Sequence, residues 1–252
     1  MKILTVNDDG VHAEGNIFLR EKLAEKNEVL TVAPHQERSS CGHAITLGEP
    51  VRLNQLDDKT YSCTGYPADC VLVALGNFYA DQRPDLVVSG INIGANLGQD
   101  RFYSGTIAAA REASFRDIPS IAVSLVLNSN DHIKHFETAA HYVSELVAKG
   151  IHKYIPKMCV LNINVPNVSV NHVKGSCLTT TGYQKYSEEI IKRTDGRGRT
   201  YFWVGGTYDG HEDIPGSDCN AVSDGYIAVT LQELSGRDVD LTNVLEEIKA
   251  II

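Results

Sequence analysis

Two adjacent carboxylates, Asp8 and Asp9, are the residues whose types and spacing point most directly to chemistry. Like charges a few ångströms apart raise each other's pKa, and a divalent cation beside them removes that penalty. Carboxylate, amide and hydroxyl oxygens suit a hard ion such as Mg²⁺, Ca²⁺ or Mn²⁺. The pair therefore indicates a metal site, although a turn with a helix cap would also use Asp8-Asp9-Gly10.

Two further polar segments carry groups that could share this site. The segment 33–42 contains Ser39, and the segment 89–98 contains Asn92 and Asn96. The glycines of the second segment are spaced by four, which suits a loop with its backbone exposed to a ligand. This spacing differs from the G-x-G-x-x-G fingerprint, so nicotinamide or flavin binding is not supported.

Ser104-Gly105-Thr106 opens a predicted helix. Hydroxyl groups and free N–H groups at a helix N-terminus form a ready anion site. Ordinary helix capping by Ser104 or Thr106 explains the same residues equally well. The sequence has neither a G-x-x-x-x-G-K-[ST] motif nor a G-x-S-x-G motif, which argues against a P-loop triphosphatase and an α/β-hydrolase.

Charge and composition narrow the choice of partners. The 252 residues include 23 Lys and Arg against 32 Asp and Glu, a net charge of −9. Duplex nucleic acid is therefore not an expected partner, because binding to its phosphate backbone needs a basic surface. A small anionic substrate remains compatible with this charge if the site holds a cation.

Hydropathy and cysteine usage predict a cytoplasmic protein without a membrane partner. The sequence has no apolar stretch of the roughly 18 residues that a membrane span needs. The opening residues reach two acidic side chains at positions 8 and 9, too early for the apolar core of a signal peptide. The six cysteines form no C-x-x-C pair, so we expect buried free thiols.

Short apolar runs alternate with helical patterns over the first 125 residues or so. Parallel strands flanked by helices follow from this alternation, and such sheets bind ligands beyond the carboxyl ends of their strands. The three polar segments are therefore expected to meet at one edge of the sheet. We predict strands over 3–6, 29–33, 86–88 and 121–126, and helices over 17–23, 70–75 and 106–115.

The second half of the chain has a different pattern. A long hairpin is expected around 183–191 and 200–204, with a turn at 194–200 between them. Such a hairpin packs poorly on its own, so we expect it to contact another subunit. The remaining predicted elements are helices over 132–148 and 239–252 and strands over 159–165 and 225–231.

Several side chains outside these segments have more than one interpretation. His35 and His43 flank the Ser39 segment and either line the site or face solvent. Trp203 and its tyrosine neighbours either stack on a base or, more plausibly, pack within the hairpin or a subunit contact. His132, His135 and His141 fall near one another on a helix but lack carboxylate neighbours at ligand spacing, which argues against zinc.

Five motifs, in order, resemble the stationary-phase survival protein SurE family. They cover the first 125 residues, and the segment Gly225-Tyr226-Ile227 also resembles the closing strand of that family. The motifs are Asn7-Asp8-Asp9-Gly10, Ala33-Pro34 with Glu37-Arg38-Ser39 and Gly42, Pro67-Ala68-Asp69-Cys70-Val71, Ser89-Gly90-x-Asn92-x-Gly94-x-Asn96-x-Gly98, and Tyr103-Ser104-Gly105-Thr106.

The resemblance implies a fold and an activity. The fold is a three-layer αβα, Rossmann-like α/β domain over 1–252 with a mostly parallel sheet, an extended β-hairpin and a C-terminal swapping segment. Its nucleotide- and metal-binding core is 1–130, and its oligomerisation region is 170–252. The activity is that of a 5′-nucleotidase, a metal-dependent phosphatase of nucleoside 5′- and 3′-monophosphates and sometimes of short polyphosphate. Homodimers or homotetramers are implied.

The resemblance also implies roles for individual residues, with one Mg²⁺ or Mn²⁺ per subunit. Asp8, Asp9, Ser39 and Asn92 would be the metal ligands. The phosphate would be held by Asn96, Ser104, Gly105 and Thr106. Two departures from the family pattern are Tyr66 in place of a small hydroxyl residue and Leu231 in place of a proline. The first bears on substrate preference and the second on the packing of the tail.

We expect hydrolysis by a metal-activated water, with Asp8 as general base. The alternative is attack by Asp8 itself to give an aspartyl phosphate, which favours D-x-D arrangements over Asn7-Asp8-Asp9. Two non-enzymatic alternatives are a phosphorylated receiver module and a nucleotide-sensing protein. A receiver needs an Asp after its third strand, where this sequence has Ser89-Gly90-Ile91-Asn92.

Overall fold

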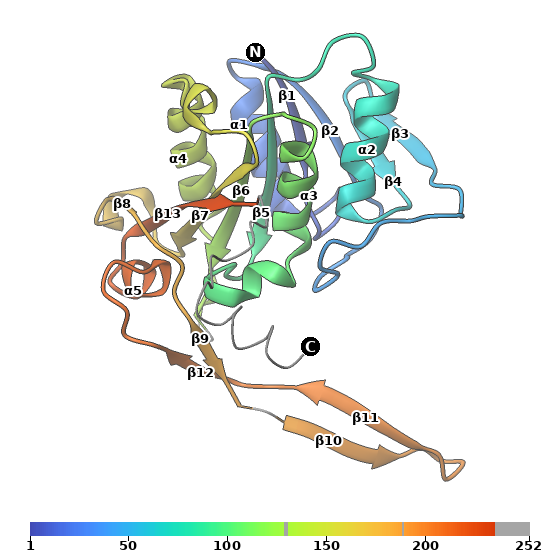
Figure 1. The fold of residues 1–252 in the computed structure, drawn as a ribbon, viewed down its shortest axis with the longest axis vertical. Coiled ribbons are helices and arrows are strands. Elements are labelled where there is room, and N and C mark those ends of the chain that lie inside the picture. Colours follow the sequence, from blue (N-terminus) through green and yellow to red (C-terminus); the bar gives the residue numbers. More distant parts are fainter. Residues whose placement is uncertain (129–130, 188, 235–252) are drawn as a thin grey trace, which may run out of the picture.

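A nine-stranded, mostly parallel sheet forms the centre of the molecule (Figure 1). The computed structural model describes residues 1–128, 131–187 and 189–234. The strand order is β3-β4-β2-β1-β5-β6-β7-β13-β8. Its five central strands are parallel: β2 (Glu28–Pro34), β1 (Lys2–Val6), β5 (Leu86–Ile93), β6 (Ser120–Val126) and β7 (Cys159–Pro166).

Helices cover both faces of this sheet (Figure 1). One face carries α1 (Glu14–Ala24) and α4 (Phe136–Ala148), and the other carries α2 (Pro67–Asn77) and α3 (Gly105–Ser114). The central strands are therefore buried on both sides, which is why apolar residues predominate in them. The predicted three-layer α/β fold is confirmed.

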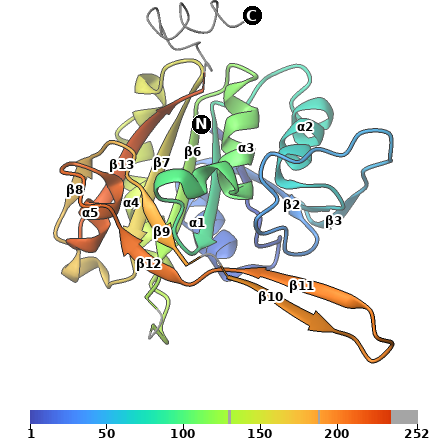
Figure 2. The same ribbon diagram turned by 60° about the horizontal axis from the view of Figure 1, so that its bottom comes forward.

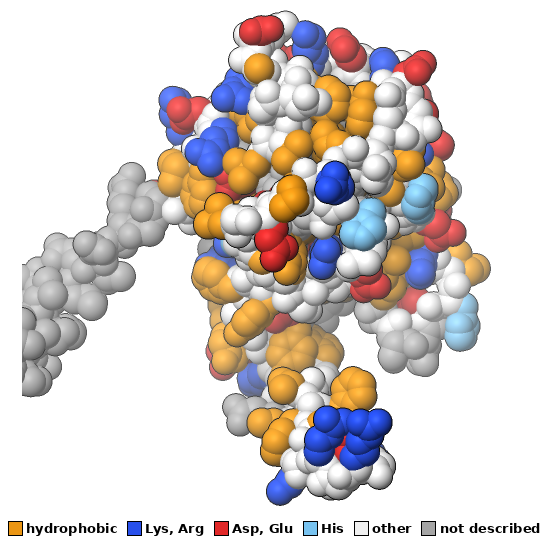
Figure 3. Space-filling view, turned by 90° about the vertical axis from the view of Figure 1, so that its right-hand side faces the viewer, with side chains coloured by type: hydrophobic (Ala, Val, Ile, Leu, Met, Phe, Trp, Pro, Cys, Tyr) orange, Lys and Arg blue, Asp and Glu red, His pale blue; other side chains and the backbone are white. Residues whose placement is uncertain are grey.

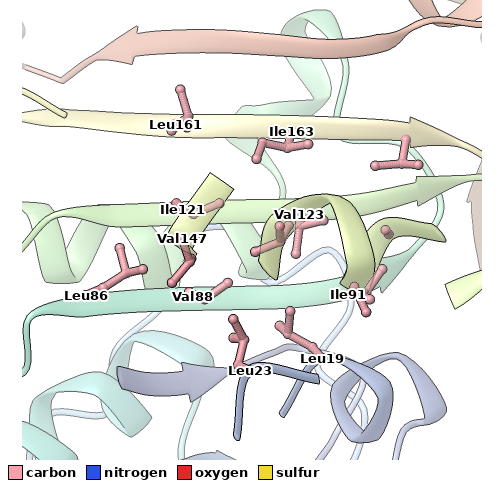
Figure 4. Packing of buried hydrophobic residues seen from close by; sticks show 14 of the residues in the cluster. Leu19, Leu23, Leu86, Val88, Ile91, Ile121, Val123, Val147, Leu161 and Ile163 are labelled. Atoms are coloured by element: carbon pink, nitrogen blue, oxygen red, sulfur yellow. The ribbon is translucent and has the colours of Figure 1, made fainter. Parts of the chain in front are cut away.

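The larger core cluster lies between the sheet and the pair α1 and α4. Figure 4 shows Leu19 and Leu23 of α1 and Val147 of α4 beside strand residues such as Val88 and Ile121. A second cluster, which includes Leu4 and Ala109, joins the sheet to α2 and α3. Both helix pairs are thereby fixed to the strands whose ends carry the polar segments.

The borders of the sheet differ from its centre. At one end β3 (Leu53–Asp57) pairs antiparallel with β4 (Thr60–Cys63), and at the other β13 (Ile227–Glu233) pairs antiparallel with β7 and parallel with β8 (Ser176–Leu178). The edge strand β3 has four exposed residues of five, so it lacks the apolar run that marks the central strands. The remaining short elements are η1 (Gly98–Phe102), η2 (Ile151–Tyr154), η3 (Val170–His172) and α5 (Asp218–Ser223).

A β-hairpin arm projects from this body (Figures 1 and 2). It consists of β10 (Glu189–Thr194) and β11 (Thr200–Gly205), and every residue of both strands is exposed. At its base β9 (Gln184–Tyr186) pairs with β12 (Tyr208–His211). Figure 3 views the arm nearly end on, with hydrophobic side chains along it and basic side chains gathered at the tip.

Several predicted boundaries require correction. The single strand expected over 183–191 is two strands, β9 and β10, which pair with different partners. The helix expected from 132 begins at Phe136, because the segment before it is held by hydrogen bonds to Asn167 instead of a helical ladder. The predicted helix 239–252 and the predicted swapping segment include residues outside the described ranges.

Candidate active site

The polar segments meet at the crevice beside β1 and β5. From β1 the chain continues to β2 on one side, whereas β5 leads to β6 and β7 on the other. Such a reversal of strand order opens a crevice at the carboxyl ends of the two strands. Asp8 and Asp9 follow β1 directly, and Asn92 lies near the end of β5. The sheet topology thus explains why these side chains are neighbours.

Asp8 faces the N-terminus of α3. The hydroxyl of Thr106 donates to Asp8 Oδ1 at 2.5 Å, and the Asp8 side chain is buried. Burial raises the pKa of Asp8, while the Thr106 hydroxyl and the amides of Gly105 and Thr106 oppose this by stabilising the carboxylate. The first turn of α3 therefore faces a carboxyl group in this arrangement, that of Asp8.

Gly105 leaves the space that this approach requires. A Cβ atom at position 105 would lie 2.8 Å from Asp8 Cβ and 2.9 Å from Cys41 Sγ. Such distances are shorter than van der Waals contact, so any side chain here would displace Asp8 or Cys41. The absence of a side chain at Gly105 thus lets Asp8 approach α3, and the Gly105 amide stabilises the Asp8 carboxylate.

Asp9 lies on the other side of the same turn. Its Oδ2 accepts a hydrogen bond from the amide of Ile93 at 3.1 Å, which ties the β1 loop to the end of β5. Burial and the nearby charge of Asp8 raise the pKa of Asp9 to about 7. The two carboxylates therefore stand where a positive charge would relieve both burial and mutual repulsion.

The segment 38–42 closes the crevice from the β2 side. The amide of Arg38 donates to the carbonyl of Asp8 at 2.7 Å, and the amide of Gly42 donates to the carbonyl of Tyr103 at 2.8 Å. Between them the Ser39 hydroxyl donates to Glu37 Oε1 at 2.7 Å. Ser40 has a φ of 55°, a left-handed conformation that a side chain makes costly and that is often found at functional sites.

The two asparagines of the 89–98 segment are held differently. Asn92 donates from its Nδ2 to the carbonyl of Gly94 at 2.8 Å, so its amide nitrogen is engaged within the loop. Asn96 is buried and fixed by three neighbours. Its Nδ2 donates to Ser124 Oγ, its backbone amide donates to Asn164 Oδ1, and its carbonyl accepts from the side chains of Asn162 and Asn164.

A cleft of about 550 Å³ opens at this edge of the sheet. It brings together five of the predicted site residues, namely Asp8, Ser39, Asn92, Asn96 and Ser104. Asp9, Gly105 and Thr106 lie behind this lining, in contact with its members through the hydrogen bonds and close approaches described above. The rest of the lining is Ser40, Ile93, Gly94, Ala95, Asp100, Tyr103, Tyr186 and Val204.

Several lining residues were missed by sequence reasoning. Tyr186 and Val204 come from the hairpin region, roughly 100 residues after the other lining segments. Asp100 ties this region to η1, because it accepts hydrogen bonds from Tyr186 Oη and from Gln184 Nε2. The only sequence signal was the richness in tyrosine of the 183–208 stretch, which does not indicate where the side chains point.

Other candidates lie outside the cleft. His43 Nε2 pairs with Glu112 at 3.0 Å and its ring stacks on Phe115, whereas His35 is exposed. Tyr66 lies under the Arg38 guanidinium, 4.9 Å from Cζ to the ring centroid, and lines an adjacent cavity. Trp203 is exposed on the hairpin. Tyr66, the residue that departs from the family pattern, therefore does not line the cleft.

The side chains present suit a hard cation. Asp8 and Asp9 supply carboxylate oxygens, and Ser39 and Asn92 supply neutral oxygens, which is the donor set that Mg²⁺ and Mn²⁺ favour. Among the described residues, no group of three or more His, Cys, Asp or Glu side chains is placed to hold a metal ion. A cation at this edge would thus depend on two carboxylates and on neutral oxygens.

No helix within the described ranges is both long enough and apolar enough to cross a membrane.

Comparison with known proteins identifies the family. Residues 3–188 match the family model described as Survival protein SurE. The chain is 42% identical over 243 residues to the 5′-nucleotidase SurE of Citrifermentans bemidjiense, which covers 96% of this chain and 95% of that protein. It is also 42% identical over 252 residues to the 5′-nucleotidase SurE of Legionella pneumophila, with 98% of each chain covered.

A solved structure agrees with this match. The crystal structure of the SurE protein from Aquifex aeolicus superposes with a TM-score of 0.85 at 36% sequence identity. The match covers 100% of this chain and 99% of the other. The two proteins therefore share the same overall fold. The chain belongs to the SurE family.

Proposed function

We propose that the chain is a metal-dependent phosphatase that releases phosphate from nucleoside 5′- and 3′-monophosphates. The observation that carries the proposal is the pair Asp8 and Asp9, placed in a sheet crevice beside the N-terminus of α3. Relatives that match nearly the whole chain bear the name 5′-nucleotidase SurE, which supports a nucleotide phosphatase. Short polyphosphate is a further candidate substrate.

One divalent ion per subunit, Mg²⁺ or Mn²⁺, is the proposed cofactor. Its ligands would be Asp8, Asp9, Ser39 and Asn92. Bound there, it would neutralise phosphate oxygens and lower the pKa of a water molecule. The raised pKa values of both carboxylates support this assignment, because each is destabilised by burial in a way that a cation would reverse.

The phosphate would lie at the start of α3. Ser104 lines the cleft and accepts the hydrogen bond from Ile107 N at 3.1 Å, which leaves its own hydroxyl proton available for a phosphate oxygen. The hydroxyl of Thr106 and the amides of Gly105 and Thr106 stabilise the Asp8 carboxylate, so these two residues would border the phosphate from the turn that holds Asp8. Asn96 lines the same wall from the β5 side.

Asp8 is the proposed general base. Its Oδ1 is engaged by Thr106, so its second oxygen, Oδ2, is the one left to take a proton from the attacking water. The alternative is nucleophilic attack by Asp8 to form an aspartyl phosphate. Borohydride trapping after brief exposure to substrate distinguishes them, because a reduced residue at position 8 would contradict attack by water.

The nucleoside would face the hairpin side of the cleft. Tyr103, Tyr186 and Val204 contribute apolar surface there, and Tyr103 is 66% exposed. Aromatic faces accept stacked bases with little sequence preference. The hairpin therefore provides substrate surface to a site whose reactive groups all come from the N-terminal half.

A homodimer or homotetramer formed through the hairpin is the proposed assembly. The arm exposes Trp203 by 63%, Ile190 by 68% and Val204 by 85%. Large apolar groups gathered on a projecting element are typical of protein interfaces. Light scattering on a variant in which 189–205 is replaced by a short turn should show a smaller assembly, and an unchanged mass would contradict this assignment.

The function is tested by phosphate release. The substrates are 5′-AMP, 3′-AMP and a chromogenic phosphomonoester, first with EDTA and then with Mg²⁺ or Mn²⁺ restored. We expect metal-dependent release that Asp8→Asn abolishes and that the exposed control Asp58→Asn retains. Nucleotide binding without release under any metal would favour a nucleotide sensor, and neither binding nor release would refute both.

A further inference from the structure

A second cavity, of about 280 Å³, lies on the flank of α3. It is bounded by η1, by the second half of α3 and by the end of β13. Its lining shares no residue with the catalytic cleft. The lining residues are Arg101, Phe102, Arg111, Gln232, Glu233 and Leu234.

Two guanidinium groups lie together in this cavity. Burial lowers the pKa of both Arg101 and Arg111, and the charge of Arg101 lowers that of Arg111 further. Their hydrogen bonds go to neutral acceptors. Arg101 Nη1 donates to Thr181 Oγ1 at 2.5 Å, and Arg111 Nη2 donates to the carbonyl of Arg101 at 3.4 Å. None of the ion pairs found in the described part of the chain includes either arginine.

Two buried donors of the same cavity have no acceptor. Arg111 Nε and Gln232 Nε2 are inaccessible and without a hydrogen-bond partner among the described residues, and Gln232 is only 5% exposed. A buried donor without an acceptor is costly and rare in folded proteins. Two such donors, one of them within the Arg111 guanidinium, belong to residues that line one cavity, which favours an acceptor-rich group there.

We propose that this cavity binds a small oxyanion of the phosphate class. The lining carries two guanidinium groups and the carboxylate of Glu233, and the charge of Asp218, outside the lining, also acts on Arg101. The oxygens of Asp218 accept hydrogen bonds from backbone amides, so the donors without an acceptor, more than the net charge, favour an anion. Guanidinium groups match tetrahedral oxyanions through pairs of parallel hydrogen bonds. A cavity of about 280 Å³ has room for a single phosphate or sulfate group but lies below the range of sites for drug-sized ligands.

The site is connected to the catalytic cleft through η1. Arg101 is flanked along the chain by Asp100 and by Phe102 and Tyr103, and both Asp100 and Tyr103 line the cleft. Arg111 shares α3 with Thr106, which lies five residues nearer to the start of the helix and to the cleft. An anion that joins Arg101 to Arg111 would hold η1 against α3. It would therefore steady one wall of the cleft without entering it.

Binding to metal-free protein tests the proposal directly. Inorganic phosphate is titrated calorimetrically in EDTA at constant ionic strength, on wild type, Arg111→Gln, Gln232→Leu and Ser104→Ala. Lys149→Gln serves as the matched loss of one exposed positive charge. We expect binding by wild type, Ser104→Ala and Lys149→Gln, and a roughly tenfold weaker affinity in the other two variants.

Gln232→Leu has a second expected signature. It removes a buried donor without an acceptor, so the protein should unfold at a higher temperature in chloride alone. The same variant should lose the thermal stabilisation that phosphate gives to wild type. A gain in one condition and a loss in the other is not produced by general damage to the fold, so the result stays interpretable if Arg111→Gln unfolds.

Three outcomes would overturn the proposal. One is the absence of phosphate binding to metal-free wild type. Another is binding that Ser104→Ala removes and Gln232→Leu keeps, which would place the anion in the catalytic cleft. The third is a change of molecular mass in Arg111→Gln with no response to phosphate, which would assign the cavity to a carboxylate of a second copy.

Discussion

Two pairs of like charges lie against the same helix, α3, and they differ in how the protein supports them. The carboxylates of Asp8 and Asp9 stand at its N-terminus, and the guanidinium groups of Arg101 and Arg111 stand on its flank. In both pairs burial shifts the pKa against the charged form. In both, one member is shifted further by the charge of the other.

The carboxylate pair is supported by donors. Thr106 donates its hydroxyl to Asp8, the amide of Ile93 donates to Asp9, and Gly105 leaves the room for this approach. Within residues 1–128, 131–187 and 189–234, the guanidinium pair hydrogen-bonds to neutral acceptors and Arg111 Nε has no acceptor. This difference supports the two proposals, a cation for the carboxylate pair and an anion for the guanidinium pair.

Glu112, on the same helix, shows a charge that has two basic partners within the protein. His43 Nε2 lies 3.0 Å from one carboxylate oxygen and Arg116 Nη2 lies 2.9 Å from the other. The His43 hydrogen bond lowers the pKa of Glu112, in contrast to the raised values of Asp8 and Asp9. Glu112 is thus a carboxylate on α3 whose charged form is stabilised by neighbouring side chains of the protein.

Gly105→Ala breaks the support of the carboxylate pair and has the largest expected effect on stability. The new Cβ would lie 2.8 Å from Asp8 Cβ, so the free energy of unfolding should fall by about 3 kcal/mol. Gly76→Ala in α2 is the matched control, because a Cβ there meets nothing within 4 Å. Urea unfolding should show the control stabilised by about 0.5–1 kcal/mol. Equal effects at both positions would refute the close approach at Asp8.

Glu112→Gln removes the charge that pairs with His43 and Arg116. We expect a loss of about 2 kcal/mol at neutral pH, because His43 and Arg116 keep their donors but lose the carboxylate. Since the folded pKa of Glu112 is lowered, its stabilisation is present above the ordinary carboxyl pKa and is lost as the pH falls through the folded value. The difference from wild type should therefore shrink in acid.

Urea unfolding across a pH series measures this difference. Glu145→Gln, at an exposed position of α4, is the control and should follow wild type throughout. A deficit of Glu112→Gln that stays constant down to the most acidic pH would show that lost packing, and not lost charge, explains it.

Asp8→Asn removes one charge of the carboxylate pair, and we expect it to raise stability in the absence of a metal ion. Asparagine keeps an acceptor for the Thr106 hydroxyl but removes a buried charge that repels Asp9. In EDTA the free energy of unfolding of the variant should be about 1 kcal/mol higher than that of wild type, which corresponds to roughly one unit of pKa. With Mn²⁺ added, wild type should gain stability and the variant should gain much less. A variant less stable than wild type in EDTA would contradict the repulsion.

The sequence was sufficient for the parallel core and for the meeting of its polar segments. Continuous apolar runs such as 86–88 and 121–126 are typical of strands buried on both faces, and the structure has β5 and β6 there. Because parallel strands end at one edge, Asp8, Ser39 and Asn92 had to converge on it. These inferences depend on local patterns and a general rule of topology.

The rest depends on contacts between distant segments that leave no local pattern. Nothing near Arg111 in the sequence indicates that Gln232 lines the same cavity, and nothing near Thr106 indicates that its hydroxyl is directed to Asp8. The edge strand β3 was missed because its residues are mostly polar and exposed. Tyr186 was missed because its place in the cleft is set by Asp100 in η1.

Tyr186→Phe is the smallest change and tests how far the two charge pairs are linked through η1. Tyr186 donates its hydroxyl to Asp100, and Asp100 precedes Arg101 directly. Loss of this one hydrogen bond should raise the KM for a nucleotide by about three- to fivefold, or about 1 kcal/mol, with little change in kcat. Tyr208→Phe, whose hydroxyl pairs with His211 Nδ1 at 3.2 Å outside the cleft lining, is the control. A fall in kcat at constant KM would instead place Tyr186 at the reacting groups. It would then act directly in the cleft and not through Asp100 and η1.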